Sequence, residues 1–494
     1  MISIDLGTSS VRACLVGSDL SILFNAQETL DLVTDFEGKA EQDPNRVLDA
    51  SMQTISQAAD YAKEQNFSIA ALSFSSAVSS LVQLNDDFNP MGNFLTYADI
   101  RSFNEVKHLR ERYQPDFFKN SAVPLHASYW LPKILWLKNK GLVHNSTRFF
   151  CTIKDLLVHQ LTGRFATDQS NAVATGICDV ETIDWHPVFL EIMGLNSENF
   201  PKIFSTTEKF EIKPEMKSRL GLPSDTILVL GATDGVLSSL GTGAVKPGQV
   251  TTMIGSSGAC RVAAKSPLLT NENLTWSYPL ADGIWIRGGA MNSGGLVADW
   301  LFDCFYADLG TSDQTIKFQK VFEEIRNVPA TSEGLIFLPY IFGERAPIWD
   351  EKARGVFFGI HEQHGRSHFA RAVFEGIIYS LFSIFEIIQT SELDKIEIRA
   401  TGGYTRSDEF LQLQSDIFAH QICVPNNHEG SSIGAAALAY FALGTYETLQ
   451  KTFDLIHITK IIKPIKNNQT SYQNGYKKFK QLYTALKPEF RREQ

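Results

Sequence analysis

The fold is decided by the opening stretch of the chain, which reads ISIDLGTSSVRACLV over residues 2–16. Two apolar, β-prone runs flank a tight turn of Gly7, Thr8, Ser9 and Ser10, and Asp5 stands at the end of the first run. The pattern predicts a β-hairpin whose tip offers N–H groups and hydroxyls, which is the chemistry of a phosphate-binding turn. On this stretch alone, a plain turn explains the residues equally well.

The same pattern returns about half a chain later, as VTTMIGSSGACRVA over residues 250–263. An apolar run again precedes a tip, here Gly255, Ser256 and Ser257, and an arginine follows each tip closely. This internal repeat predicts two related domains, each presenting one phosphate hairpin to a shared cleft. We place the boundary in the glycine-rich segment before the second hairpin, which gives domains of residues 1–242 and 243–494.

Composition narrows the class of protein. The 494 residues are too many for one core, and 44% are hydrophobic and 20% charged, as in globular proteins. A net charge of −10 argues against a nucleic-acid surface, which needs a basic stripe. It leaves an anionic small substrate open, because a few cations can dominate one cleft.

Cysteines and apolar runs indicate the compartment. The six cysteines are scattered without a CxxC pair, and we interpret them as free thiols in a reducing compartment. The N-terminus has no basic n-region and no apolar core of signal-peptide length, so we expect it to be the mature start. The longest apolar region, residues 376–388, is broken by polar residues and predicts a buried helix rather than a membrane span. We therefore expect a cytoplasmic protein with no membrane or nucleic-acid partner.

Strands and helices alternate along the chain, which predicts an α/β fold. Residues 44–63 are helix-prone and follow Asp43, a plausible N-cap. Residues 226–231 form a near-continuous apolar run, as expected of a central strand covered on both faces.

Asp234 comes directly after that central strand and before Gly235 and a helix. Open α/β sheets bind ligands at this end of their strands. Phosphoryl transfer to a hydroxyl group needs a carboxylate in such a place to accept the proton. The alternative interpretation is that Asp234 only caps the helix.

Other motifs in the chain are weaker evidence for a functional site. Neither a Walker loop nor a GxGxxG fingerprint occurs. Residues 430–434 match GxSxG, but they open a helix of small residues rather than follow a buried strand, so we do not predict a hydrolase. His361, His364 and His368 have helix-face spacing, but without further ligands a solvated cluster is the favoured interpretation over a metal site. The Gly402-Gly403 pair after a predicted strand allows close approach to adenine, and a plain turn explains it too.

Taken together and in order, these motifs resemble the FGGY family of carbohydrate kinases over roughly residues 2–444. DLGTSS (5–10) resembles the first phosphate motif, GATDGV (231–236) the catalytic segment, IGSSG (254–258) the second phosphate motif, and TGGYTRSD (401–408) the adenosine signature. The resemblance implies an α/β, two-domain, actin-like (ribonuclease-H-like) fold with the active site in the interdomain cleft.

Within the family, gluconate kinases look most similar, which implies ATP-dependent phosphorylation of D-gluconate to 6-phosphogluconate. The segments that carry this likeness are residues 73–77, 97–102, 232–240 and 343–349. The chain departs from the usual sugar contacts at Val78 and Ser79, where Met-His is common, and at Tyr97 and Ile100. Xylulokinase, another sugar or polyol kinase of the family, and an actin-like ATPase without kinase activity stay open as alternatives.

The resemblance also implies roles for individual residues. Asp234 would act as the base, Asp5 would hold Mg²⁺ through water, and Arg12 would steady the phosphoryl group. The residues expected to bind ATP are Gly7, Thr8, Ser9, Gly255, Ser256, Ser257, Gly295, Asp299, Gly402, Gly403 and Ser407. The residues expected at the sugar are Val78, Ser79, Arg101, His126, Lys154, Asp234 and Gly235.

A sugar acid carries a carboxylate, so its far end should meet a cation. Arg101, Lys154 and His126 are the candidates, with ordinary surface charge as the alternative for each. Asp168 and Ser170 resemble a family segment near the sugar, without a defined role. For the assembly state, the prediction is a homodimer.

Overall fold

The computed structural model describes residues 1–390, 396–426 and 429–491. Backbone contacts divide the chain into two compact units. Unit 1 comprises Met1–Lys246, Ala263–Arg287 and Glu429–Ile456, and unit 2 comprises Pro247–Val262, Gly288–His428 and His457–Gln494. Each unit is therefore assembled from separate stretches of the chain, whereas a single boundary near residue 242 treats each domain as continuous.

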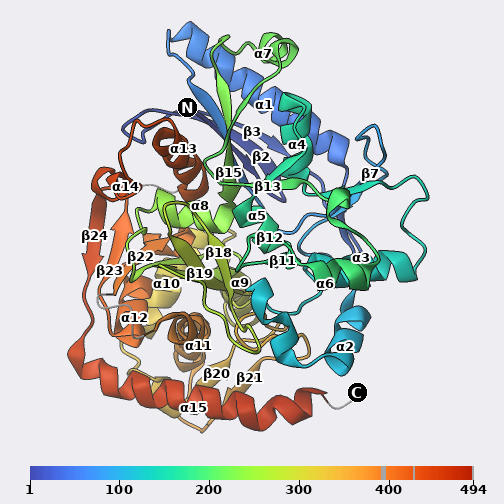
Figure 1. The fold of residues 1–494 in the computed structure, drawn as a ribbon. Coiled ribbons are helices and arrows are strands. Elements are labelled where there is room, and N and C mark those ends of the chain that lie inside the picture. Colours follow the sequence, from blue (N-terminus) through green and yellow to red (C-terminus); the bar gives the residue numbers. More distant parts are fainter. Residues whose placement is uncertain (391–395, 427–428, 492–494) are drawn as a thin grey trace. The chain divides into compact units, whose positions relative to one another are not determined.

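Unit 1 is built on a sheet with the strand order β14-β15-β6-β1-β2-β3 (Figure 1). Its strands are β1 (Ile2–Leu6), β2 (Ser10–Val16), β3 (Ile22–Thr29), β6 (Ala71–Ser76), β14 (Lys209–Glu211) and β15 (Ile227–Thr233). β1 and β2 form the predicted antiparallel hairpin, which places Asp5 opposite Arg12. β6 runs parallel to both β1 and β15, so these three strands end at the same edge of the sheet.

Alternation of side chains along β1 gives the sheet two different faces. Ile2, Ile4 and Leu6 are buried in one cluster with α1 (Pro44–Glu64) and α4 (Ile153–Thr162). Asp5 points the other way, toward α13 (Gly430–Ala442), whose Ser431 contacts it. Both faces of the sheet are thus covered by apolar clusters, and Asp5 lies on the face that packs against α8 (Asp234–Gly241) and α13.

The predicted first helix is confirmed as α1, with Asp43 accepting a hydrogen bond from the Asn45 amide at 2.9 Å. Pro44 at the first helical position costs no hydrogen bond, because that amide has no partner inside the helix. The side-chain cap and the proline together explain why the helix begins here.

Helix α13 packs very closely against α8 (Asp234–Gly241) (Figure 1). A Cβ atom added to Gly434 would lie 1.9 Å from the Leu237 carbonyl oxygen, and one on Gly241 would lie 1.8 Å from the Gly430 carbonyl oxygen. The small residues of the GxSxG-like segment therefore serve helix packing. They open a helix, as the sequence predicted, and no nucleophile elbow is present there.

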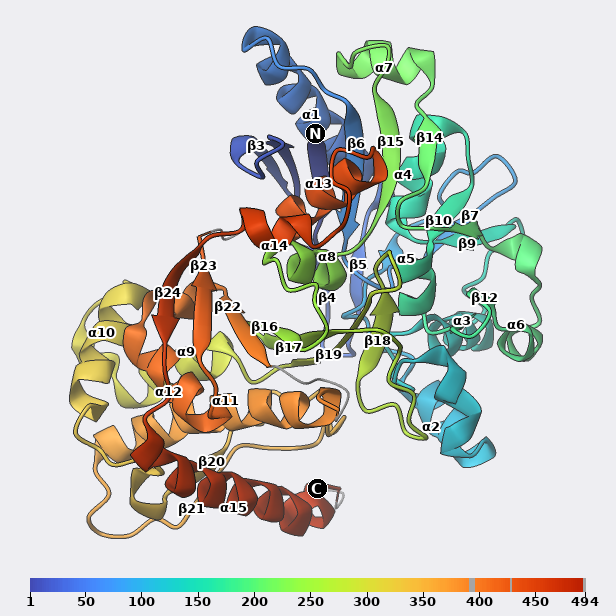
Figure 2. The ribbon, with the colours of Figure 1, turned by 60° about the vertical axis from the view of Figure 1, so that its left-hand side comes forward.

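The second hairpin belongs to another sheet, with the strand order β18-β19-β17-β16-β22-β23-β24 (Figure 2). The strands are β16 (Gln249–Ile254), β17 (Gly258–Ala264), β18 (Trp276–Pro279), β19 (Trp285–Met291), β22 (Glu397–Thr401), β23 (Ile422–Pro425) and β24 (Ile458–Ile462). β16 and β17 pair antiparallel up to Ile254 and Gly258, as predicted from the repeat.

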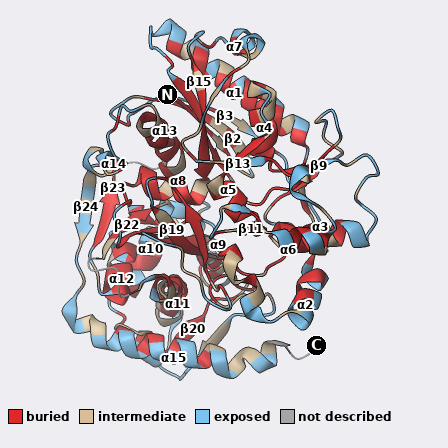
Figure 3. Cartoon of the chain, in the orientation of Figure 1, coloured by how far each residue is buried: buried red, intermediate tan, exposed pale blue. Residues whose placement is uncertain are grey.

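The helices of unit 2 supply its core. They are α9 (Gly295–Phe305), α10 (Gln314–Ile325), α11 (Arg366–Ile388), α12 (Asp408–Phe418) and α15 (Lys466–Arg491). Residues 376–388 lie in α11 and are mostly buried, whereas α15 exposes much of its surface (Figure 3). Among the helices described, none is long and apolar enough to cross a membrane.

His361 and His364 precede α11 and only His368 lies within it, so the three do not share a helix face. The rings of His361 and His364 are 3.8 Å apart between centroids. In the part of the chain that the structure describes, no group of three His, Cys, Asp or Glu residues could hold a metal ion. The interpretation of a histidine cluster without a metal agrees with this geometry.

Gly434 offers a direct test of the α8–α13 packing. Gly434→Ala should lower the free energy of unfolding by about 1–3 kcal/mol, because a methyl group has no room against the α8 backbone. Denaturant titration followed by circular dichroism measures this. The matched control is Gly365→Ala, where an added Cβ meets nothing within 4 Å. Equal stability of the two variants would contradict the packing argument.

Candidate active site

Asp234 is the first residue of α8 and follows directly on the buried strand β15. The N-cap is Thr233, so the alternative that Asp234 caps the helix is wrong. The Asp234 Oδ1 accepts a hydrogen bond from the Gly235 amide at 2.6 Å, and the side chain is only partly buried. A carboxylate in the first turn of a helix is stabilised by the N-terminal end of the helix dipole. The carboxylate is therefore anchored at the start of α8 and partly accessible.

A β-bulge just before Asp234 shapes this strand end. The register of β15 against β6 shifts between Val229 and Ala232. Gly231 lies in the bulge with φ +78°, and a Cβ atom there would be 1.8 Å from the Phe74 carbonyl oxygen. Only glycine fits such a position, which explains why the segment GATDGV begins with one.

Asp5 lies near the end of β1, which is separated from β15 by β6, and it is held by two hydroxyl groups. Its Oδ1 accepts from Ser75 Oγ at 2.6 Å and its Oδ2 from Ser431 Oγ at 3.0 Å. Burial raises the pKa of Asp5, while Ser75, Ser431 and Arg12 oppose that rise. A sheltered carboxylate of this kind gains from a nearby cation. Mg²⁺ commonly binds through one or two carboxylates and its own waters, so a single aspartate fits it.

Each hairpin tip is closed by a hydrogen bond from its first glycine, but the first tip is one residue longer than the second. The Gly7 amide donates to the Ser10 carbonyl at 3.1 Å, and the Gly255 amide donates to the Ser257 carbonyl at 2.8 Å. Ser9 and Ser256 are exposed at the two tips. Gln42 also supports the first tip through a 2.8 Å hydrogen bond to the Thr8 carbonyl. The repeat seen in the sequence is therefore a repeat of the antiparallel hairpin, with turns of different length.

Arg12 has partners that the sequence did not reveal. Its guanidinium forms an ion pair with Glu429 and donates to Gln27 Oε1 at 3.1 and 3.3 Å. Any action of Arg12 on a phosphoryl group would compete with Glu429. Its predicted role stays a prediction.

On the predicted sugar side, Arg101 is surrounded by carboxylates. It donates to Asp99 at 2.6 to 3.2 Å and to Glu41 at 2.5 Å, and its guanidinium lies 4.4 Å from the centre of the Trp136 ring. These contacts join the segment around residue 41 to the segment around residue 99. Its charge is already compensated, so a substrate carboxylate would have to share it.

Lys133 lies beneath the same segment and was missed by the sequence interpretation. It is fully buried on α3 (Trp130–Asn139), and its Nζ donates to the Thr96 carbonyl at 2.5 Å. Burial lowers the pKa of Lys133 to about 7, with the charge of Asp99 acting in the opposite direction. A lysine in a helical pattern usually indicates a surface position, which is why sequence alone hides this one.

Val78, predicted at the sugar, lies close to Gly7 and Thr8 of the first tip, which were predicted to bind ATP. Gly7, Thr8, Val78 and Tyr97 line one small cavity of about 20 Å³, which is water-sized. Ser79 has φ +57° and its Oγ donates to the Ala174 carbonyl. His126 is 8% exposed, with Nδ1 2.9 Å from Ser128 Oγ.

Lys154 is placed differently from the prediction. Its side chain has no exposed surface and forms an ion pair with Asp168, which is equally buried. Its Nζ also donates to the Leu230 carbonyl at 3.3 Å. A cation enclosed in this way is not positioned to contact a sugar carboxylate.

Unit 2 contains a cavity of about 770 Å³, within the usual size range of small-molecule sites. It brings together Gly255, Gly295, Gly403 and Ser407, four residues predicted to bind ATP. Residues not predicted also line it, among them Phe318, Arg326, Tyr404 and Asp408. Gly402, with φ +101°, packs beneath the cavity, since a Cβ atom there would be 2.5 Å from the Ile254 carbonyl oxygen. Asp299 accepts from Gln314, which lines the cavity, at 3.0 Å.

Glu344 supports the second hairpin and was also missed. This buried carboxylate accepts from the Asn292 amide and from Ser293 Oγ, both at 2.5 Å. The segment it holds leads to Gly295, whose amide donates to the Gly255 carbonyl at 2.7 Å. Burial raises the pKa of Glu344, and these donors oppose the rise. Glu344 therefore fixes the loop against which the tip of the second hairpin rests.

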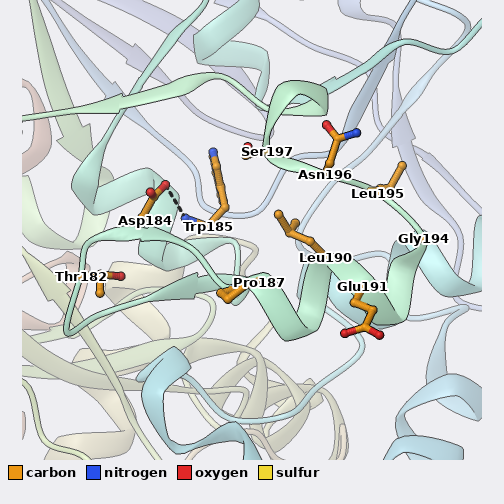
Figure 4. A pocket seen from close by; sticks show the side chains of 10 residues that line it. All are labelled: Thr182, Asp184, Trp185, Pro187, Leu190, Glu191, Gly194, Leu195, Asn196 and Ser197. Carbon is orange, nitrogen blue, oxygen red and sulfur yellow. Dashed lines mark hydrogen bonds between the residues drawn. The ribbon is translucent and has the colours of Figure 1, made fainter.

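A separate groove of about 760 Å³ lies beside α6 (Pro187–Met193) in unit 1 (Figure 4). Trp185, Leu190 and Leu195 form its apolar part, and Asp184 and Glu191 carry charge there. No predicted site residue is among those that line it.

The comparison with protein families decides the class. The description "FGGY family of carbohydrate kinases" matches residues 1–241 for its N-terminal domain and residues 250–443 for its C-terminal domain. The chain belongs to the FGGY family of carbohydrate kinases. The predicted two-domain α/β fold of this family is thereby confirmed.

Individual relatives agree with the family. The gluconokinase of Bacillus subtilis is 32% identical, over 96% of this chain and 93% of that protein. A ligand-bound xylulose kinase from Lactobacillus acidophilus has a TM-score of 0.93 at 31% identity, covering 99% of this chain and 98% of the other. A gluconate kinase from the same organism has a TM-score of 0.92 at 32% identity, covering 98% and 97%.

Lys133 should make the stability of this FGGY kinase depend on pH. The unfolded lysine has a pKa of 10.5 and the folded one a pKa of about 7, so between these values the unfolded chain binds more protons. The free energy of unfolding should therefore rise with pH across this window, by up to about 1.4 kcal/mol per pH unit from this group. Denaturant titrations at pH 7, 8 and 9 should show that Lys133→Met removes part of this rise.

The control for this measurement is Lys140→Met, at the exposed end of the same helix. It should keep the wild-type pH dependence. If wild type and Lys133→Met give parallel curves, the buried lysine does not titrate as stated.

Glu344→Gln should weaken nucleotide binding while the fold persists. The substitution turns one buried acceptor into a donor, which faces either the Asn292 and Arg345 amides at Oε1 or the Ser293 amide and hydroxyl at Oε2, at a cost of about 1–3 kcal/mol. We expect the KM for ATP to rise about tenfold and the KM for the sugar to change less than twofold. Steady-state kinetics of both substrates measure this. Equal changes in both KM values would contradict a role confined to the second hairpin.

Proposed function

We propose that this FGGY kinase transfers the γ-phosphoryl group of ATP to the terminal hydroxyl of a sugar acid, D-gluconate, giving 6-phosphogluconate. The observation that carries the proposal is the likeness to gluconokinase along nearly the whole chain, at 32% identity. The carboxylate of Asp234, accessible at the end of β15, supports the reaction type. Xylulose is the second candidate, because the xylulose kinase of known structure is 31% identical.

In this proposal Asp234 orients the attacking hydroxyl and accepts its proton. Phosphoryl transfer needs little further covalent chemistry from the protein. Catalysis therefore depends mainly on positioning the hydroxyl and neutralising the charge on the phosphates. The bond between Asp234 Oδ1 and the Gly235 amide fixes the carboxylate on α8. Because the preceding strand β15 is buried, the backbone that carries Asp234 is held in one position.

Charge on the phosphates would be met by three kinds of group. Thr8 and Ser9 of the first tip, and Ser256 and Ser257 of the second, offer N–H groups and hydroxyls, which bind phosphate without a lysine. Asp5, held by Ser75 and Ser431, would keep Mg²⁺ in place through water. Mg²⁺ neutralises phosphate charge when bound. Arg12 would add a charge-assisted hydrogen bond.

The nucleoside would occupy the cavity of unit 2. Gly403 lies at this cavity, and an added Cβ atom there would meet nothing within 4 Å, so its backbone is open to a flat ligand. Tyr404 and Phe318 supply apolar surface to the cavity. Polar and charged side chains such as Gln314, Arg326 and Asp408 also line the cavity, and this combination of apolar and hydrogen-bonding groups suits adenosine.

The proposal for the sugar acid rests on Arg101 and His126, because Lys154 is enclosed with Asp168. Arg101 is 15% exposed, and Asp99 and Glu41 hold its guanidinium in a fixed orientation. A substrate carboxylate would then bind to a pre-positioned cation at the expense of one of these ion pairs. Val78 and Ser79 would shape the neighbouring part of the sugar site.

Asp234→Asn tests the base. The variant should fold as wild type, because an amide keeps the size and an acceptor oxygen. Its kcat should fall by about 10²–10⁴-fold, the usual contribution of general base catalysis. A coupled assay of ADP release measures turnover, with the exposed Asp86→Asn as control. Near wild-type turnover would exclude Asp234 as the base.

A panel of gluconate, xylulose, glycerol and ribulose tests the substrate. We expect gluconate to give a kcat/KM at least tenfold above the others in the same assay. A preference for xylulose would establish the second candidate instead. ATP consumption that no sugar stimulates would contradict the sugar-acid assignment and favour an ATPase of another kind.

A further inference from the structure

Lys154 and Asp168 form a completely buried ion pair in unit 1, and neither residue has a role in the mechanism so far. Both side chains have no exposed surface. Burying two charges is costly unless each is fully hydrogen-bonded, so a pair like this needs a structural reason. The contacts around it lead to the strand end that carries Asp234.

The first contact is made by Lys154 itself. Besides Asp168, its Nζ reaches the carbonyl of Leu230 at 3.3 Å. Leu230 lies within the β-bulge of β15, where the register against β6 shifts between Val229 and Ala232. The lysine thus ties the bulge to α4, the helix on which it stands.

The second contact runs through Asp168 and the helix that it caps. Asp168 Oδ1 accepts from the amides of Ser170 and Asn171 at 2.9 and 3.0 Å, at the start of α5 (Gln169–Ala174). Its Oδ2 accepts from Asn171 Nδ2 at 2.8 Å. Asn171 Oδ1 in turn accepts from Ser76 Oγ at 3.0 Å, at the end of β6. One carboxylate therefore fixes the orientation of the whole first turn of α5.

Ser170 connects the first turn of α5 to Thr233, the residue before Asp234. Its Oγ lies 3.0 Å from Thr233 Oγ1 and accepts from the Thr233 amide at 3.4 Å. Thr233 is the N-cap of α8 and Asp234 is the next residue. Ser170, Asn171 and Thr233 are all buried, at 1% exposure or less, so water does not compete for these bonds.

We propose that Lys154, Asp168 and Ser170 are positioning residues that hold the strand end and the first turn of α8, and hence the carboxylate of Asp234, in place for proton transfer. This inference rests on the proposed function of Asp234 as the base. It replaces the prediction that Lys154 reads the substrate carboxylate. A base displaced by about 1 Å can lose about 10²-fold in rate, so a supporting network of this kind has a measurable effect.

Ser170→Ala is the mildest test, since it removes one hydroxyl and leaves the ion pair intact. We expect kcat to fall at least tenfold, with the KM values for sugar and ATP changing less than twofold. Ser170→Thr keeps the hydroxyl and should retain most of the wild-type kcat. A variant that merely destabilises the fold would show neither the split between kcat and KM nor the rescue.

Lys154→Met tests the ion pair, and Lys154→Met/Asp168→Asn replaces it if the single variant does not fold. Asparagine can still cap α5, so the double variant leaves no unpaired buried charge. We expect kcat to fall at least tenfold in either. The matched control is Lys217→Met. Lys217 is 9% exposed and donates to the Ser224 carbonyl at 2.5 Å, before the opposite end of β15, so its loss should leave kcat unchanged.

Hydrogen–deuterium exchange gives a readout that does not depend on the substrate. Peptides covering residues 230–236 should exchange faster in Ser170→Ala and in the ion-pair variant, and peptides covering residues 71–75 should not. Wild-type kcat in these variants, or wild-type exchange at residues 230–236, would overturn the proposal. If no sugar supports turnover by the wild-type protein, the proposed function fails, and exchange alone then decides whether this network holds the strand end.

Discussion

Parallel pairing of β1, β6 and β15 is the constraint on which the site in unit 1 depends. Because β6 runs parallel to both neighbours, the three strands end at one edge of the sheet, with Ser75 paired to Asp5 on one side and to Ala232 on the other. The two carboxylates of interest, Asp5 and Asp234, are thereby delivered to the same edge from segments more than 200 residues apart. A shift of one residue in the register of β1 against β6 would turn Asp5 to the face packed against α1 and α4.

Close helix packing completes that edge. Gly241 and Gly434 let α8 and α13 approach until a Cβ atom would overlap the opposing backbone, and this approach brings Ser431 to Asp5. In the sheet, Gly231 likewise allows close approach of two backbones, because the bulge in which it lies faces the backbone of Phe74. Glycine is needed at these positions because backbone meets backbone, so they contribute to function only through geometry.

Buried polar groups provide the rigidity around the candidate residues. Asp168 with Lys154 in unit 1 and Glu344 in unit 2 each accept several hydrogen bonds within segments that lack regular structure or just begin a helix. Each group would be strongly destabilising if left unpaired, so the surrounding loops have few alternative arrangements. In each unit a buried carboxylate organises a segment beside residues predicted to take part in the site: Asp168 near Asp234, and Glu344 near Gly255.

Much of this could be predicted from the sequence because it is local. The two hairpins, the central strand at residues 227–233, the helix that follows it and the position of Asp234 at their junction follow from apolar periodicity and turn residues, which act over a few neighbours. The family likeness rests on those same short motifs. What only the tertiary structure decided is which charges are already engaged. Arg101 meets Asp99 and Glu41, Lys154 meets Asp168, Arg12 meets Glu429, and Lys133 is buried although its sequence context suggests a surface helix. A side chain's charge is visible in the sequence, but its environment depends on segments brought together by folding, and that environment determines what the charge can bind.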